Sequence, residues 1–460
     1  MLTQLSFTNF KAWKATGPIQ LAPITVFFGS NSAGKTSIPQ LLLLLKQTAE
    51  SSDRQRVLQL GDSRTLIDLG TFSDVVHNHD IGQSLDFALE WTLDQNLIID
   101  EPTTHKEYIG NKMKFQAELV ADKRHQPNVE SFSYELKSDN ATKLDLFFRR
   151  RQTTNKYELS STNYNLVRHQ GRAWPLPEPV RFYGFPEEVA AYYQNASFTS
   201  DLVFQLEKML RSIYYVGPLR EYPSRLYLWS GEIPDHVGMR GDRAIEAILA
   251  AGDRHFNWIA KQKTKPLATL VAERLRAMGL IHDFAVKPLG QNRKEYEVLV
   301  KTRAKLPEVK LTDVGFGVSQ VLPVIVESFY VPKNSIVIFE QPEIHLHPRV
   351  QADLADLFVD AVRAREGAVN RNCQFIIESH SEHFLRRLQR RIAEEAIDSK
   401  DVALYFVDIG DDGATIAALG VDLFGNIKNW PEGFFGDEME DLVARTEAQA
   451  RRSKKKEKAG

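Results

Sequence analysis

Apolar and polar positions at the start of the chain follow a strand, loop and helix order. Leucine and phenylalanine recur within the first ten residues, and residues 24–28 form a short apolar run typical of a buried strand. A glycine-rich turn follows, and then a helix with consecutive leucines at residues 41–45. The pattern over residues 1–83 therefore predicts strands that lead through a glycine turn into a buried helix.

Beyond this unit the pattern changes three times. Residues 84–182 alternate apolar and polar positions between Asn, Asp, Gly and Lys clusters, which predicts an inserted antiparallel β-rich subdomain. Residues 183–299 favour helical spacing, and residues 300–447 alternate strands with helices. Residues 448–460 are basic and contain no apolar cluster, so we expect a disordered, solvated tail there.

Composition limits the classes of protein that remain possible. The chain has 460 residues, with 58 Lys and Arg against 60 Asp and Glu, so its net charge of −2 does not indicate a nucleic-acid coat. Its single cysteine, Cys373, excludes a disulfide within one chain and a thiolate zinc cluster. No apolar run approaches the ~20 residues that span a bilayer, and the N-terminus lacks a signal-peptide pattern. We therefore expect a soluble, cytoplasmic protein without a membrane segment.

The strongest motif lies at residues 29–36, where Gly-Ser-Asn-Ser-Ala-Gly-Lys-Thr matches the phosphate-binding pattern G-x-x-x-x-G-K-[ST] between a strand and a helix. Glycines let successive N–H groups turn toward phosphate oxygens, and the helix N-terminus adds partial positive charge. Lys35 would bridge the β- and γ-phosphates of ATP, and the Thr36 hydroxyl would hold Mg²⁺. If Lys35 opens the helix, Pro39 would distort its first turn. The predicted nucleotide contacts here are Gly29, Ser30, Asn31, Ser32, Ala33, Gly34, Lys35, Thr36 and Ser37.

A second polar cluster follows an apolar strand at residues 336–340. Glu340 ends this strand, and the carboxyl edge of a parallel sheet is where ligands bind. From that edge Glu340 could order the Mg²⁺ shell through water, and Glu343 could polarise the attacking water. A solvated strand end is the alternative for Glu340.

Two more segments extend the candidate site. Glycines precede an apolar helix near residue 316, which predicts an anion site made by Gly315, Gly317, Ser319 and Gln320; a plain helix cap is the alternative. His380 follows another buried strand, from where it could touch a γ-phosphate or the attacking water.

Together these motifs resemble a known family. Residues 5–11, the phosphate loop, Glu-Gln-Pro-Glu-Ile-His-Leu-His-Pro at 340–348 and Glu-Ser-His-Ser at 378–381 are similar to the ABC-type ATPases of the SMC, RecF and overcoming-lysogenization-defect (OLD) group. The chain most resembles stand-alone bacterial predicted ATPases that end in Trp-Pro-x-Gly-Phe-Phe, here residues 430–435. The resemblance implies an α/β P-loop NTPase fold, an ATPase head with an inserted β-rich and helical subdomain. The ATPase lobes would be residues 1–83 and 300–447.

The resemblance also implies roles for single residues. Heads of this group dimerise head to tail around two ATP molecules, with Lys35 and Thr36 as the Walker A pair and Glu340 as the Walker B acid. His380 would be the switch histidine and Lys11 a further nucleotide contact. Residues 315–320 would be the signature that reaches the opposite chain's nucleotide.

Two departures from the family pattern leave alternatives open. Gly315 stands where the signature serine is usual, with Ser319 further on, so the signature contacts would be mainly backbone. Gln341 stands where a catalytic glutamate is usual, so the base would be Glu340 or Glu343. Relatives of this kind are ATPase subunits of antiphage systems such as Septu and PARIS, which implies a separate nuclease or toxin as effector and a phage protein or DNA as trigger. A slow-hydrolysing, ATP-bound scaffold that sequesters a toxin and a RecF-like DNA-repair ATPase are the alternatives.

Overall fold

The computed structural model describes residues 1–102, 105–151, 156–171, 174–252, 254–257, 263–291 and 293–430, together with residues 445, 446 and 448. Of the basic tail expected at 448–460, only residue 448 lies among them. Residues 431–435 of the C-terminal motif also lie outside the described residues. No described helix combines the length and the apolar character needed to cross a bilayer.

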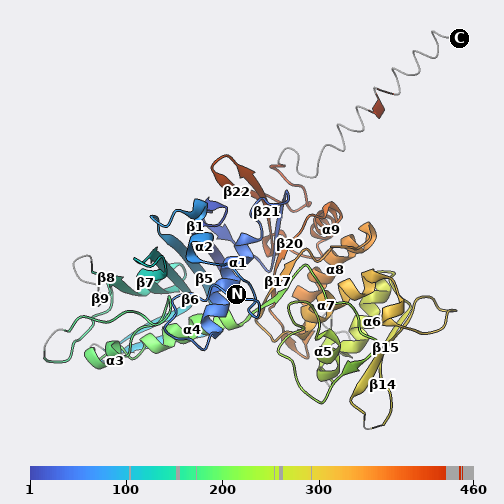
Figure 1. Cartoon of the computed structure of the whole chain (residues 1–460), viewed down its shortest axis with the longest axis horizontal. Helices are drawn as coiled ribbons and strands as arrows, with labels where there is room; N and C mark the ends of the chain where they lie inside the picture. Colours follow the sequence, from blue (N-terminus) through green and yellow to red (C-terminus); the bar gives the residue numbers. More distant parts are fainter. Residues whose placement is uncertain are drawn as a thin grey trace.

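A six-stranded sheet forms the centre of the molecule (Figure 1). Its strands, in spatial order, are β10 (Ile213–Val216), β17 (Ile336–Glu340), β20 (Gln374–Glu378), β4 (Ile24–Gly29), β21 (Val402–Gly410) and β22 (Gly413–Leu419). The first five run parallel, and β22 returns as a hairpin. Every residue of β17 and β20 is buried, as expected for parallel strands covered on both faces. This topology confirms the predicted α/β fold.

The two faces of this sheet belong to different hydrophobic cores. Ile336 and Ile338 pack into the core that contains α1 (Ser37–Glu50), whereas Val337 and Phe339 pack into the core that contains α7 (Phe316–Tyr330). Period-two alternation along β17 sends successive side chains to opposite faces. The sheet therefore separates α1 from α7.

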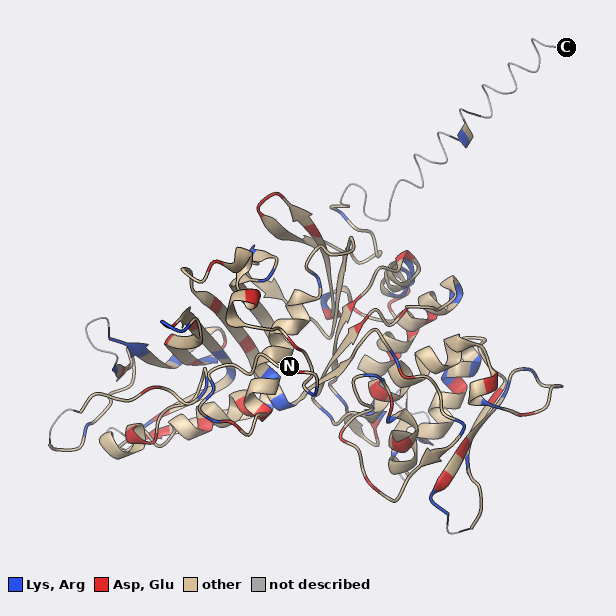
Figure 2. Cartoon of the chain, in the orientation of Figure 1, with Lys and Arg blue, Asp and Glu red and all other residues tan. Residues whose placement is uncertain are grey.

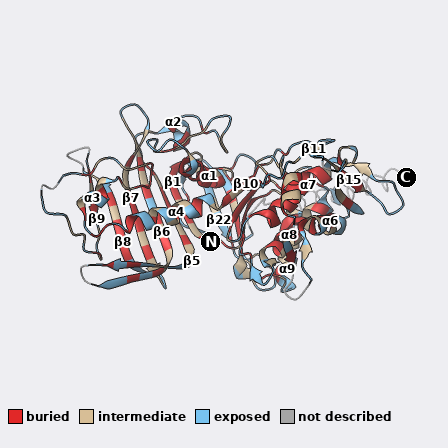
Figure 3. Ribbon diagram, turned by 90° about the horizontal axis from the view of Figure 1, so that it is seen from below, coloured by how far each residue is buried: buried red, intermediate tan, exposed pale blue. Residues whose placement is uncertain are grey.

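An antiparallel sheet extends from the α1 side (Figures 1 and 3). Its strands are β2 (Trp13–Ala15), β1 (Leu2–Phe10), β5 (Leu85–Glu101), β6 (Lys106–Ala121), β7 (Pro127–Ser138), β8 (Ala141–Arg150) and β9 (Tyr157–Ser160), with β3 (Ile19–Gln20) beside β1. One face packs with α1 and α4 (Thr199–Arg211) in a shared core. Because Leu5 of β1 pairs with Leu89 of β5, the boundary expected at residue 83 falls inside one continuous sheet.

Helices cover the opposite side of the central sheet. They are α5 (Ala244–Ala250), α6 (Leu267–Ala277), α7, α8 (Pro348–Arg363) and α9 (Glu382–Ala393). Beside them lie two small sheets, built from β11 (Tyr227–Leu228), β14 (Asp283–Pro288), β15 (Glu295–Lys301) and β16 (Val309–Lys310), and from β12 (His255–Asn257), β13 (Lys265–Pro266), β18 (Arg365–Glu366) and β19 (Val369–Asn370). Short turns of helix complete the described part: α2 (Phe72–Val75), α3 (Glu188–Tyr192), η1 (His77–His79), η2 (Leu311–Asp313) and η3 (Ser399–Asp401).

Candidate nucleotide-binding site

The phosphate loop joins β4 to α1, as the motif requires. Gly29 has φ 144°, and a Cβ there would lie 1.9 Å from the carbonyl oxygen of Val407 on the neighbouring strand β21. Gly34 has φ 95°, and its Cβ would press on Ala12, Ala414 and Trp13. Both positions therefore need glycine, because side chains rarely adopt these angles and neighbouring groups fill the space.

Lys35 lies inside the curve of this loop and is 3% exposed. Its Nζ donates to the carbonyl oxygens of Gly29 at 3.1 Å and Ser30 at 2.6 Å. Burial lowers the pKa of the lysine, and the carboxylates of Glu378 and Glu343 oppose that shift. The ammonium group is thus held among loop atoms that face phosphates in proteins with this motif.

The first turn of α1 is regular although Pro39 lies in it. The helix begins at Ser37, so Pro39 is its third residue, where an N–H group has no partner within the helix. The N–H of Gln40 donates to the carbonyl oxygen of Thr36 at 3.0 Å. The expected distortion does not occur because the helix begins two residues later than that prediction assumed.

Two glutamates end neighbouring strands beside the loop. Glu340 of β17 pairs in register with Glu378 of β20, which in turn pairs with Phe27 of β4. Glu340 is 7% exposed and Glu378 is 5% exposed. Burial, with a further contribution from the charge of Glu378, raises the pKa of Glu340 to about 7, whereas a hydrogen bond from Tyr215 lowers it. The predicted Walker B acid therefore lies at the carboxyl edge of the sheet, next to a second buried acid.

Sequence reasoning assigned no role to this second acid. Burial raises the pKa of Glu378. The neighbouring Thr36 hydroxyl, the charge of Lys35 and the Gln341 side chain oppose this rise. The available signal was an apolar strand that ends in a carboxylate, the same pattern that singled out Glu340.

Glu343 and His380 contact each other at the same edge. The N–H of His380 donates to Oε1 of Glu343 at 2.6 Å, and Glu343 is 7% exposed. Burial raises the pKa of Glu343. The His380 side chain hydrogen-bonds to the backbone of Gly29, and burial together with the charge of Lys35 lowers its pKa. The histidine thus lies between the acid-bearing strands and the phosphate loop.

Arg220 is a further buried group at this edge. Its guanidinium donates to the carbonyl oxygens of Glu340 and Gln341, both at 3.3 Å, and to that of Pro218 at 3.4 Å. It is 4% exposed, and burial lowers its pKa to about 10. Its contacts are to the backbone that carries the Walker B acid.

Lys11 and the polar loop residues surround this arrangement. Nζ of Lys11 donates to Oε1 of Gln40 on α1 at 2.7 Å, and its charge lowers the pKa of Glu340. Ser30, Asn31 and Ser32 are exposed, and Ala33 is buried. The side chains predicted at the loop and at the Walker B strand are therefore close together in one chain.

The predicted signature lies on the other side of the sheet. Gly315 is exposed and precedes α7, and no side chain caps that helix end. The Phe316 ring is 38% exposed and contacts Tyr222 and His345, with 5.4 Å between ring centroids in each pair. Gly317 lies against Leu346 and Leu280.

The remaining two signature residues face inward. Ser319 and Gln320 are 7% and 1% exposed, and the Ser319 hydroxyl donates to the carbonyl oxygen of Phe316 at 2.8 Å. The start of α7 thus presents backbone and the Phe316 ring to solvent.

Other candidate chemistry receives little support. The described residues contain no group of three or more His, Cys, Asp or Glu side chains placed to hold a metal ion.

On α9, Arg387 and Arg391 pair with Asp356 of α8, Arg386 pairs with Glu382, and Arg390 pairs with Glu394. Figure 2 shows both signs of charge along this helix. Acids therefore pair with all four of these arginines.

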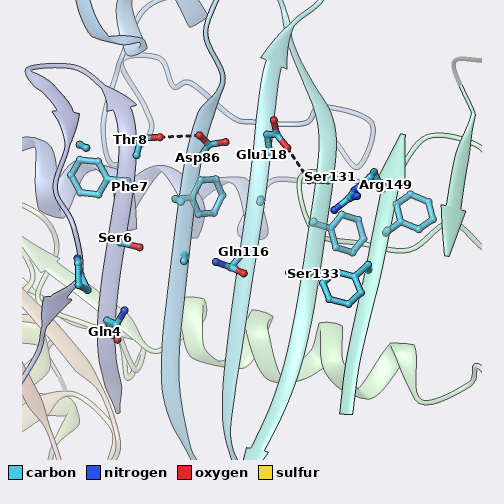
Figure 4. Close-up of a pocket in the computed structure, with 18 of the residues that line it drawn as sticks. Gln4, Ser6, Phe7, Thr8, Asp86, Gln116, Glu118, Ser131, Ser133 and Arg149 are labelled. Atoms are coloured by element: carbon cyan, nitrogen blue, oxygen red, sulfur yellow. Dashed lines mark hydrogen bonds between the residues drawn. The ribbon is translucent and has the colours of Figure 1, made fainter. Parts of the chain in front are cut away.

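A large hollow lies elsewhere in the described part of the chain. A space of about 610 Å³ opens over the polar face of the antiparallel sheet (Figure 4). Thr8 bonds to Asp86 there at 2.9 Å, and Ser131 bonds to Glu118 at 3.1 Å. It contains no residue of the phosphate loop.

Comparisons with known proteins point to one family. A family model described as "AAA ATPase domain" matches residues 1–179 and 250–385, more than half of the chain. A second model, described as "Protein of unknown function (DUF3696)", matches residues 397–444. No curated protein matches the chain.

Solved SMC heads are among the similar structures. An SMC head bound to the C-winged helix domain of ScpA is 10% identical, with a TM-score of 0.43 over 91% of this chain and 98% of that one. The SMC head domain from Thermotoga maritima is 11% identical, with a TM-score of 0.39 over 91% and 99%. An SMC head with an extended coiled coil, bound to the C-terminal domain of ScpA and derived from Pyrococcus furiosus, is 10% identical, with a TM-score of 0.38 over 91% and 96%.

Proposed function

Because this chain belongs to the AAA ATPase domain family and is an ATPase, we propose that two copies close head to tail on two molecules of ATP and Mg²⁺. Hydrolysis reopens the pair, and the cycle controls a separate effector protein. Each nucleotide would be held by the phosphate loop of one copy and sealed by the start of α7 of the other.

One observation carries this proposal. The phosphate loop and α1 lie on one side of the six-stranded sheet, and the uncapped, exposed start of α7 belongs to the core on the other side. The phosphate loop and the start of α7 therefore belong to different layers of one chain. A helix N-terminus with free N–H groups attracts anions, and a second copy offers it the phosphates bound to the opposite loop.

The residues at the loop suit the chemistry of phosphoryl transfer. Lys35 would neutralise phosphate charge, Thr36 and Glu340 would hold Mg²⁺, and Glu340 or Glu343 would orient the attacking water. When bound, Mg²⁺ would supply charge neutralisation at the phosphate oxygens. His380 would sense the γ-phosphate from its position beside Gly29. Catalysis would come mainly from positioning and electrostatic stabilisation.

The motifs that resemble antiphage ATPase subunits support a nuclease or toxin as the effector, in the bacterial cytoplasm. A phage protein or DNA would be the trigger. The paired arginines on α9 give no support to the RecF-like alternative, which depends on salt-sensitive DNA contacts.

A second function, an ATP-bound scaffold that sequesters a toxin, is favoured by one observation. Gln341 occupies the usual position of the catalytic glutamate, and its side chain lies beside Glu378. Turnover of the purified chain, alone and with phage protein or DNA, separates the two functions. Hydrolysis near background in every condition supports the scaffold.

Sedimentation of the Glu340→Gln variant tests the pairing. Without the acid, hydrolysis should slow while ATP still binds, so the mass should double when ATP and Mg²⁺ are added. A variant that binds ATP and stays monomeric at every concentration would overturn the pairing. Lys35→Ala is the matched control, because it should remain monomeric.

A further inference from the structure

We propose that Glu378 is the second acid of the Mg²⁺ site, so that its carboxylate, with Glu340 and Thr36, holds the Mg²⁺ of bound ATP directly or through water. This inference rests on the proposed ATP and Mg²⁺ chemistry and extends it to a residue with no assigned role. Gln341 is the positioning residue that orients the Glu378 carboxylate.

The first support is the placement of the two acids. Glu340 and Glu378 are directly paired on adjacent parallel strands, and β20, which carries Glu378, lies between β17 and the loop strand β4. Of the two acids, Glu378 is therefore on the strand nearer to the phosphate loop. Its carboxylate lies beside the hydroxyl of Thr36, which lowers the pKa of the acid, and Thr36 is the residue whose motif position holds Mg²⁺.

The second support is an unsatisfied oxygen. Oε2 of Glu378 has no hydrogen-bond partner in the described structure, although the residue is only 5% exposed. Leaving a buried carboxylate oxygen unpaired is unfavourable, because nothing replaces the water that it loses on burial. The charge of Glu340 beside it adds repulsion, which a divalent cation between the two acids would relieve.

The third support is the conformation of Gln341. This residue has φ 43°, and its N–H donates to the carbonyl oxygen of Glu378 at 2.9 Å. Its side chain also lies beside the Glu378 carboxylate and lowers the pKa of that acid. A glutamate at 341 would add a third negative charge to the pair, whereas glutamine can donate a hydrogen bond and fix the direction of the acid.

The donor set fits Mg²⁺ specifically. This ion binds proteins through one or two carboxylates or hydroxyls, and it keeps waters and phosphate oxygens as its other ligands. Such a site does not need the closed group of three or more metal-binding side chains that the described residues lack.

Mg²⁺-dependent binding of a fluorescent ATP analogue tests this role without relying on hydrolysis. Mg²⁺ should tighten binding to the wild-type chain relative to EDTA. Glu378→Gln should reduce the Mg²⁺-dependent increase in affinity at least about tenfold. Its affinity in EDTA should be unchanged or higher, because a negative charge near the phosphates is lost. Glu382→Gln, four residues further along on α9, should behave as wild type. Gln341→Ala should lose part of the gain.

The outcomes separate this inference from the proposed function. If the wild-type chain binds no ATP in either condition, the proposed function fails. If the wild-type chain shows the Mg²⁺ gain and Glu378→Gln keeps all of it, only the role of Glu378 fails. Should Glu378→Gln not fold, Glu378→Asp decides, because its shorter side chain should reduce the gain at unchanged EDTA affinity; an unreduced gain overturns the inference.

Discussion

Nη2 of Arg220 donates to the carbonyl oxygen of Glu340 at 3.3 Å and so ties the backbone of the Walker B acid to the segment that follows β10. The same segment reaches the start of α7. Tyr222 contacts Phe316, and Arg225 bonds to Asp313 at 3.0 Å. One short stretch of chain therefore touches both the acid edge and the start of α7, so in the proposed dimer a shift of the acid edge on hydrolysis would reach the surface that faces the partner's nucleotide.

Replacing Arg220 with methionine should uncouple the acid edge from the start of α7. The guanidinium bonds to backbone carbonyl oxygens at the acid edge, and hydrogen bonds to charged groups contribute about 1.5–3 kcal/mol. We expect kcat to fall about 10–100-fold while ATP affinity changes little. Steady-state hydrolysis with a binding titration measures both. Arg240→Ala, at a half-exposed surface pair with Glu221, should match wild type; equal losses in both variants would contradict the role of Arg220.

Lys35→Ala should abolish measurable ATP binding. The variant loses a buried ammonium that lies among the loop carbonyl oxygens, and each charged contact to phosphate contributes about 1.5–3 kcal/mol. Equilibrium binding of labelled ATP checks this loss, with the exposed Lys14→Ala as control. Wild-type affinity in a folded Lys35→Ala protein would remove the nucleotide-site assignment.

Phe316→Asp should prevent ATP-induced pairing while leaving ATP binding intact. The ring is exposed at the start of α7, and an aspartate there would place negative charge against the partner's phosphates. Light scattering with ATP and Mg²⁺ measures the mass. Phe204→Asp is the matched control, since that ring is 61% exposed on α4, on the other side of the molecule. If the Phe316→Asp variant still pairs at the ATP concentrations that pair the wild-type chain, the head-to-tail arrangement is contradicted.

The stability of the chain should fall between about pH 5 and pH 8 because of Glu327 on α7. This side chain is fully buried, and burial raises its pKa to about 8. The folded form then holds a proton that the unfolded form releases above its ordinary pKa, so the free energy of unfolding decreases as pH rises, by at most about 1.4 kcal/mol per unit. Denaturant unfolding at several pH values measures the slope.

Glu327→Gln isolates this contribution. The amide stays neutral at every pH and can still accept the N–H of Val237, which bonds to Oε2 of Glu327 at 3.0 Å. Wild type and variant should be similarly stable at pH 5, and the variant should be the more stable at pH 8. Parallel curves across this range would show that Glu327 does not titrate in the folded chain.

Motifs that are contiguous in the sequence predicted much of this structure. The features that depend on pairing between distant segments could not be predicted in this way. The phosphate loop, Glu340 and His380 were found because each follows an apolar strand or leads into a helix within a few residues. The pairing of Glu340 with Glu378 joins residues from different motifs, and its register depends on packing of the whole sheet. The inclusion of β10 in the central sheet, within a segment that favoured helical spacing, was hidden for the same reason.

Arg220 shows a second limit of sequence reasoning. The role of a buried arginine is inferred from the groups that it contacts. Here these groups are backbone carbonyl oxygens, which every residue type carries, so the sequence does not indicate them. The hollow over the antiparallel sheet is similar, since it arises from the curvature of several strands together.

Cross-linking between chains tests the head-to-tail account most directly. Ser32→Cys in one population and Gly315→Cys in a second, differently tagged one would place thiols in the loop and before α7, both at exposed positions, while the native Cys373 is buried. A short bismaleimide should join the two tagged chains only when ATP and Mg²⁺ are present, and Lys35→Ala should abolish the product. ATP-bound chains that never join, or that join these positions only within one chain, would contradict the account.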